Sequence, residues 1–220
     1  MYNLVIKEFL LQKKYMIIYV LYGIGIAAAA CFTPGIVSNF FYVFYITTAS
    51  YLSVMYSNGY EMKGQSEVML NSLPVNREQI INAKYIYLQI LIILYSILIL
   101  IFSFIARVIN INSTAAFNIN MYVISFIVLG LVFSIYYPLY FKLGREKLRV
   151  VTLFFYLIIF ISPEFYSKAA RNPEKYHLVK VLTFVTDNTD LVLISLSAVV
   201  ILLLIASSSI STRIYKNKEF

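Results

Sequence analysis

The segment Tyr60–Tyr85, YEMKGQSEVMLNSLPVNREQIINAKY, is the longest polar stretch in the first two-thirds of a very apolar chain. Long apolar runs flank it on both sides. Within it, Pro74 ends a helix-compatible piece from Gln65 to Ser72, because proline lacks a backbone N–H and restricts the residue before it. Asn76 then predicts the N-cap of a second helix, with Gln79 as its capping-box partner. The segment is therefore predicted to lie at one end of an apolar helical body.

The composition predicts an all-α polytopic membrane protein. Of the 220 residues 61% are hydrophobic and 13% charged, and the mean hydropathy is +0.80; soluble domains have about 45–50% apolar and about 25% charged residues. Six apolar runs each approach the roughly 20 residues that a helix needs to cross a bilayer. They are Tyr15–Phe32, Ile36–Tyr56, Tyr85–Val108, Ile119–Phe141, Val150–Ser167 and Leu191–Ile210.

Three further segments complete this single transmembrane domain, predicted over residues 1–220. Residues 1–14 have apolar residues at helical spacing beside lysines, which indicates an interfacial helix. Residues 57–84 are predicted to form a cytoplasmic loop whose short helix is suited to receiving a push from a soluble partner, and we call it the coupling loop. Residues 162–190 include an apolar stretch too short to span, which indicates a re-entrant external helical hairpin before the last span; a plain external loop is the alternative.

The distribution of basic residues orients the spans. With the N-terminus in the cytoplasm, 13 of the 18 Lys and Arg residues fall on the inner side, as the positive-inside rule requires for short loops. They are Lys7, Lys13, Lys14, Lys63, Arg77, Lys84, Lys142, Arg145, Lys147, Arg149, Arg213, Lys216 and Lys218. Both termini are therefore predicted in the cytoplasm, and the net charge of +8 indicates topology rather than nucleic-acid binding.

Small residues in the first run indicate close helix packing. Gly23 with Ala27, and Gly25 with Ala29, are small-xxx-small pairs, which let two helix backbones approach. The pattern is compatible with packing inside the chain and with packing across a dimer.

The sequence offers no residues for catalysis or metal binding. A single cysteine, Cys31, excludes an intramolecular disulfide and a cysteine-based zinc site. The single histidine, His177, excludes a histidine cluster, and no phosphate-binding or dinucleotide-binding glycine motif is present. The predicted spans also lack mid-membrane charges of the kind that ion-coupled carriers use. We therefore expect no enzyme activity, no cofactor and no energy source within this chain.

Two stretches resemble the ABC-2 type transporter permease family. The first is Glu61-x-Lys63-Gly64, followed by LNSLPVNR at residues 70–77 and AKY at residues 83–85. The second is YPLYFKLGREK at residues 137–147. Within the family, the small bacterial permeases that export phenol-soluble modulins and similar antimicrobial or cytolytic peptides are the most similar. The resemblance implies a permease of the bacterial plasma membrane that exports amphipathic or hydrophobic molecules.

The same resemblance implies partners and contact residues. A dimer of a separate cytoplasmic ATPase would bind ATP and magnesium, and a second permease, identical or paralogous, would complete the transporter. The predicted ATPase-coupling residues are Glu61, Lys63, Glu67, Leu70, Leu73 and Arg77, and Arg145 and Lys147 are a possible second contact. Simple anchoring in a solvated, membrane-flanking surface is the alternative for these residues.

A different function with the same architecture also fits the sequence. The chain could be a non-transport membrane immunity or sensor subunit that binds a toxic peptide. An intramembrane enzyme is disfavoured, because the spans lack the buried polar groups that such chemistry requires.

Overall fold

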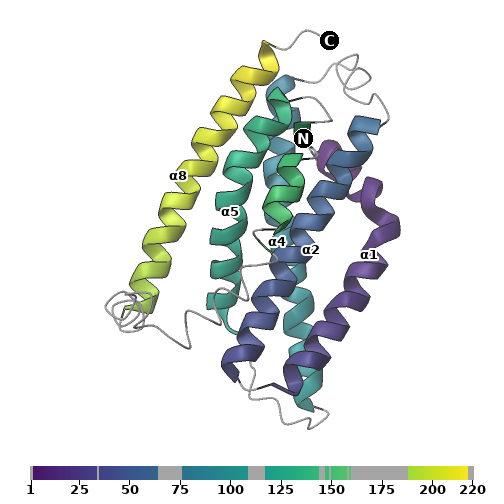
Figure 1. Ribbon diagram of the computed structural model, residues 1–220, viewed down its shortest axis with the longest axis vertical. Helices are drawn as coiled ribbons and strands as arrows, with labels where there is room; N and C mark the ends of the chain where they lie inside the picture. The colour runs from purple at the N-terminus through teal and green to yellow at the C-terminus, as the bar shows by residue number, and fades with distance from the viewer. Residues whose placement is uncertain are drawn as a thin grey trace.

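Long helices running side by side build the protein (Figure 1). The computed structural model describes residues 2–33, 35–63, 76–108, 117–143, 147–148, 150–157, 159 and 188–217. Its long helices are α1 (Tyr2–Cys31), α2 (Gly35–Lys63), α4 (Arg77–Val108), α5 (Ile119–Lys142) and α8 (Thr189–Lys216). Residues 150–157 are also helical. The all-α prediction is confirmed for these described residues.

The bundle has two distinct ends. α1 begins, α2 ends, α4 begins, and both α5 and α8 end at the same end of the bundle (Figure 1). We call it the terminal end. At the opposite end α1 turns into α2 and α5 begins after Asn118. The described helix ends that the sequence predicts on the cytoplasmic side therefore gather at one end.

The number of spans is confirmed only in part. Among the described residues, four helices are long and apolar enough to cross a membrane, and they are α1, α4 from Arg77 to Ala106, α5 and α8. α2 is 29 residues long and covers the predicted second span, but it is not among the four. Its many Ser, Thr and Tyr residues lower its hydropathy. The predicted fifth span and the predicted hairpin at 162–190 lie largely or wholly outside the described residues.

α1 differs from the prediction of a separate interfacial helix. It runs without a break through the predicted boundary at Lys14. Val5, Glu8, Gln12, Tyr19 and Gly23 lie on its buried face, so the first fourteen residues pack against the bundle. The buried face continues through Lys14 because the polar residues Glu8 and Gln12 occupy positions on it that are one helical turn apart.

The two small-residue pairs of α1 have different surroundings. A Cβ added at Gly23 would lie 2.7 Å from the ring of Tyr45 on α2, whereas a Cβ at Gly25 would meet no atom within 4 Å. Ala27 is 5% exposed, and Ala29 is exposed. The first pair therefore serves packing inside the chain, and the second faces outward.

α8 packs against α5 through a glycine and a proline. A Cβ at Gly130 would lie 2.2 Å from a methyl group of Val200, so this glycine permits the close approach. Pro138 has no N–H for the carbonyl of Ser134 one turn earlier. The hydroxyl of Ser207 on α8 donates to that carbonyl at 2.7 Å. The polar group freed by proline thereby joins two helices.

Candidate functional site

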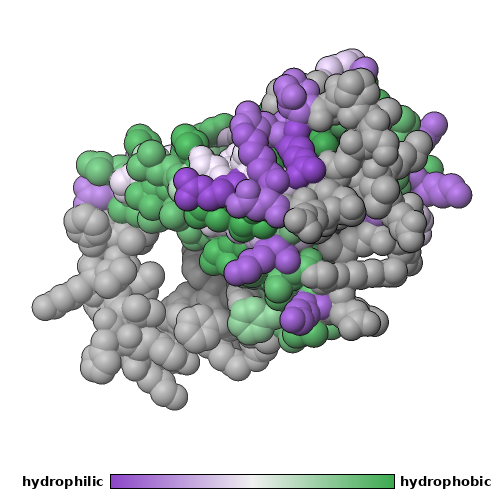
Figure 2. All heavy atoms as spheres, turned by 90° about the horizontal axis from the view of Figure 1, so that it is seen from above, coloured by the Kyte–Doolittle hydropathy of each residue, from purple (hydrophilic) through white to green (hydrophobic). Residues whose placement is uncertain are grey.

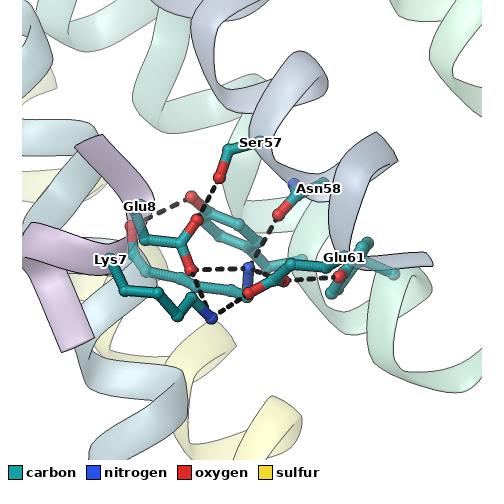
Figure 3. Close-up of polar contacts among 8 residues, drawn as sticks. Lys7, Glu8, Ser57, Asn58 and Glu61 are labelled. Carbon is teal, nitrogen blue, oxygen red and sulfur yellow. Dashed lines mark hydrogen bonds and ion pairs between the residues drawn. The ribbon is translucent and has the colours of Figure 1, made fainter. Parts of the chain in front are cut away.

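A cluster of buried charged side chains ties the helices together at the terminal end (Figure 3). At its centre is the ammonium of Lys84, from the second turn of α4. It donates to Asn58 Oδ1 at 2.8 Å, to Glu61 Oε2 at 2.5 Å and to Glu8 Oε1 at 3.2 Å. An ammonium has three donors, so all three are used inside the protein.

Lys7 and Ser57 are further partners of the two carboxylates. Lys7 forms an ion pair with Glu61 and lies 3.4 Å from Glu8 Oε1, and the hydroxyl of Ser57 donates to the second oxygen of Glu8. Lys7 and Glu8 come from α1, and Ser57 and Glu61 from α2 (Figure 3). The cluster therefore joins α1, α2 and α4.

α5 contributes two tyrosines to the same place. Tyr140 donates its hydroxyl to Glu61 Oε2 at 3.1 Å, and its ring lies 5.2 Å from the Lys84 nitrogen. Tyr137 donates to the backbone carbonyl of Lys84 at 3.0 Å. Both tyrosines are buried. A fourth helix is thus held to the cluster by polar contacts.

The cluster is electrically balanced, and its charged groups other than Lys7 are buried. Two lysines and two glutamates give no net charge, and Glu8, Glu61 and Lys84 are each 3% exposed. Burial alone would raise the pKa of the Glu61 carboxyl, but the ammonium groups of Lys84 and Lys7 outweigh it and lower that pKa to about 2. Removing one member of such a buried pair costs about 3–5 kcal/mol because a buried charge is left uncompensated.

The chemistry of the cluster is that of a structural tie. Every charged group in it contacts a group of opposite sign on another helix. Among the described residues, no group of three or more His, Cys, Asp and Glu side chains could hold a metal ion.

Arg77 forms a second polar tie at this end. The guanidinium donates to the backbone carbonyls of Tyr215 at 3.1 Å and Lys216 at 2.9 Å, and it lies 6.0 Å from the ring of Tyr215. The last carbonyls of a helix have no partner within the helix, and a cation there also interacts favourably with the helix dipole. Arg77, the first residue of α4, therefore caps the end of α8.

The predicted coupling residues fall into three groups. Glu61 and Arg77 have intramolecular partners, as described above. Lys63 is the last residue of α2, and Lys147 is exposed on a short helical piece. Glu67, Leu70, Leu73 and Arg145 lie outside the described residues. The structure thus brings Glu61 and Arg77 to the same end, and contact with an ATPase remains a prediction for every residue of the set.

Sequence reasoning missed most of the cluster. Only Glu61 was among the predicted site residues; the missed members are Lys7, Glu8, Ser57, Asn58, Lys84, Tyr137 and Tyr140. One signal was available, because Glu8 and Gln12 share a helical face with Leu4 and Val5. A carboxylate on an apolar face indicates a buried partner, since charged residues are almost never fully buried unless paired.

The surface of the terminal end is polar. Figure 2 looks onto this end and shows hydrophilic side chains gathered over the described part, with apolar side chains along the flanks. The exposed pair Lys216–Glu78, at 2.5 Å, lies here and joins α8 to α4. Such a surface is typical of the part of a membrane protein that meets water.

Comparison with known proteins agrees with this architecture. Residues 3–216 match the family model described as ABC-2 family transporter protein. No curated protein and no solved structure matches the chain. Because the match covers nearly the whole chain, the protein belongs to the ABC-2 family of transporter proteins. It is a multi-pass membrane protein and the permease component of an ABC transporter.

Proposed function

We propose that this chain is the membrane subunit of an ATP-driven exporter that moves amphipathic or hydrophobic molecules, such as antimicrobial or cytolytic peptides, out of a bacterial cell. A dimer of a separate ATPase would bind the loop at residues 57–84 from the cytoplasm. A second permease, identical or paralogous, would face this one across the export route. The terminal end would then be the cytoplasmic end.

The observation that carries this proposal is the cluster around Lys84. It lies where the predicted coupling loop leaves α2 and enters α4, and it joins both helices to α1. Because separating buried opposite charges costs several kcal/mol, the ends of these three helices resist separation. A displacement of the loop would therefore move α1, α2 and α4 as one unit.

This mechanism assigns different parts to the predicted coupling residues. Glu61 is buried, so it would act as a positioning residue that fixes α2 to Lys84. Arg77 would pass the same displacement to α8 through its bonds to the terminal carbonyls. Direct contact with the ATPase would fall to Lys63, Glu67, Leu70 and Leu73, with Arg145 and Lys147 as a second contact.

The test is co-expression of the chain with the ABC ATPases of its own genome. We expect one ATPase to co-purify and to drive ATP-dependent uptake of an amphipathic peptide into inside-out vesicles. Glu67→Ala combined with Leu70→Ala is expected to reduce both readouts. Lys142→Ala, an exposed lysine outside the predicted contacts, serves as the matched control.

Two results would overturn the proposal. One is unchanged ATPase binding and transport in the double variant, which would refute the assignment of the coupling loop. The other is full protection against a toxic peptide by this chain in cells without any partner ATPase. That second result would identify an immunity or sensor subunit in place of an exporter.

A further inference from the structure

A groove of about 460 Å³ lies between α2 and α5 at the opposite end of the bundle from the charged cluster. Pockets for small molecules measure roughly 300–1,000 Å³, so the groove falls at the small end of that range. Asn39, Asn118 and Asn120 line it where the two helices begin. Phe44, Thr47 and Val128 line it further along the same helices.

The groove runs along the helix axes. Asn39 and Thr47 on α2 are about 12 Å apart along the axis, and Asn118 and Val128 on α5 about 15 Å, at ~1.5 Å per residue. Since both helices run from this end into the apolar part of the bundle, the groove extends from the edge of the bundle inward. An extended molecule in it would lie parallel to the neighbouring lipid chains.

The polar and apolar parts of the groove are separated along this axis. The three asparagines at the rim are neutral hydrogen-bonding groups, of which Asn118 already accepts the backbone N–H of Asn120 with its side-chain oxygen at 3.4 Å. No charged side chain is among the described residues that line the groove. Deeper in, the hydroxyl of Thr47 donates to the carbonyls of Val43 at 2.9 Å and Phe44 at 3.0 Å. The hydroxyl is therefore used within its own helix, and the inner walls are effectively apolar.

We propose that this groove binds an amphiphile with one apolar chain and an uncharged, hydrogen-bonding head group, oriented like an outer-leaflet lipid. Among the described residues that line the rim, a charged head would find no opposite charge to offset its lost hydration, and such a loss is costly. The modest volume favours one chain over the two of a phospholipid. The inference deepens the proposed function, on which it depends for placing this end in the outer leaflet.

The absence of tryptophan from the chain makes a direct binding test possible. Phe44→Trp places a single fluorophore in the groove, and Ile124→Trp supplies a second one on the α5 wall. Phe104→Trp on α4 is the matched control, because Phe104 is 64% exposed on the flank of the bundle. Quenching by a monoacylglycerol brominated on its chain is measured in nanodiscs that contain the purified chain alone.

We expect quenching of both groove tryptophans to saturate at low mole fractions of the probe. Quenching of the control tryptophan is expected to keep rising over the same range without saturating. Asn120→Leu is expected to weaken binding about fivefold, the effect of losing one hydrogen bond of about 1 kcal/mol. A brominated fatty acid, with its charged head, is expected to bind more weakly.

Superimposable quenching curves for the groove and control tryptophans would refute the groove as a binding site. Equal affinity for the fatty acid and the monoacylglycerol would refute its preference for an uncharged head. Neither readout requires ATP or a partner. Failure of ATP-driven uptake with intact quenching would therefore refute the proposed function alone, and loss of saturable quenching with intact uptake would refute this inference alone.

Discussion

At the scale of single residues, the buried charges at the terminal end depend on partners far away in the sequence. Lys84 meets Glu61 at a separation of 23 residues and Glu8 at a separation of 76. Composition placed Glu8 in a basic surface helix and Glu61 in a polar loop. Both placements follow from the rule that charged side chains are usually exposed. The rule does not hold where packed helices bring opposite charges together.

Lys84→Met keeps the length of the side chain but leaves the carboxylates of Glu8 and Glu61 without their shared cation. We expect the free energy of unfolding to fall by about 3–5 kcal/mol, measured by denaturant unfolding in detergent. Lys216→Met is the control, because its pair with Glu78 is half exposed and such pairs contribute about 0–1 kcal/mol.

A second substitution sharpens this test. Lys84→Met combined with Glu61→Gln restores a neutral cluster of Lys7 and Glu8, so we expect it to recover a large part of the lost stability. Equal, small losses for Lys84→Met and Lys216→Met would contradict the assignment of the cluster as the tie between α1, α2 and α4.

Acid provides a separate test of Glu61, which lies beyond the apolar part of α2. Its pKa is lowered from 4.5 to about 2 in the folded protein. A carboxyl with a lowered pKa stabilises the fold fully above its ordinary value, and this contribution is lost as the pH falls towards the folded value. We expect the wild type to lose more stability than Glu61→Gln between pH 4.5 and 2, measured by thermal unfolding. Parallel curves for the two proteins would show that Glu61 is not ion-paired.

At the scale of helices, local signals predicted where α4 begins. α4 starts directly after Asn76, the predicted N-cap, and the backbone carbonyl of Asn76 accepts the N–H of Gln79 at 2.9 Å, as in the first turn of a helix. The continuity of α1 through Lys14 did not follow, because Glu8 on its buried face finds its partners on α2 and α4. Local patterns reveal caps and turns, whereas these contacts depend on tertiary packing.

The two glycines of α1 offer a matched pair of substitutions. Gly23→Ala places a Cβ 2.7 Å from the Tyr45 ring, and we expect it to cost about 1–3 kcal/mol, as overpacking does. Gly25→Ala meets open space, so only the helix propensity changes, which favours alanine by about 1 kcal/mol. Chemical unfolding of both variants in detergent measures the difference. A loss at Gly25 and none at Gly23 would reverse the assignment of the two faces.

At the scale of the whole molecule, hydropathy and charge predicted a helical membrane protein whose polar segments gather at one end. The family match and the arrangement of α1, α2, α4, α5 and α8 agree with that class. The predicted count of six spans is less well supported. The many hydroxyl groups of α2 lower its hydropathy, and α2 is not among the four helices that are apolar enough to cross a membrane. Hydroxyl groups that bond within the bundle, such as Ser53 with Tyr95 at 2.6 Å, are compatible with a buried helix.

The orientation of the terminal end in the membrane is the claim on which the proposed coupling to an ATPase depends. In a Cys31→Ala background without the ATPase, Tyr60→Cys marks the terminal end and Phe32→Cys marks the opposite end, since these residues are 41% and 83% exposed. A membrane-impermeant maleimide is applied to intact cells and to inside-out vesicles. We predict that Tyr60→Cys reacts only in the vesicles and Phe32→Cys only in the cells. The reverse pattern would place the coupling loop outside the cell, where no ATPase could bind it.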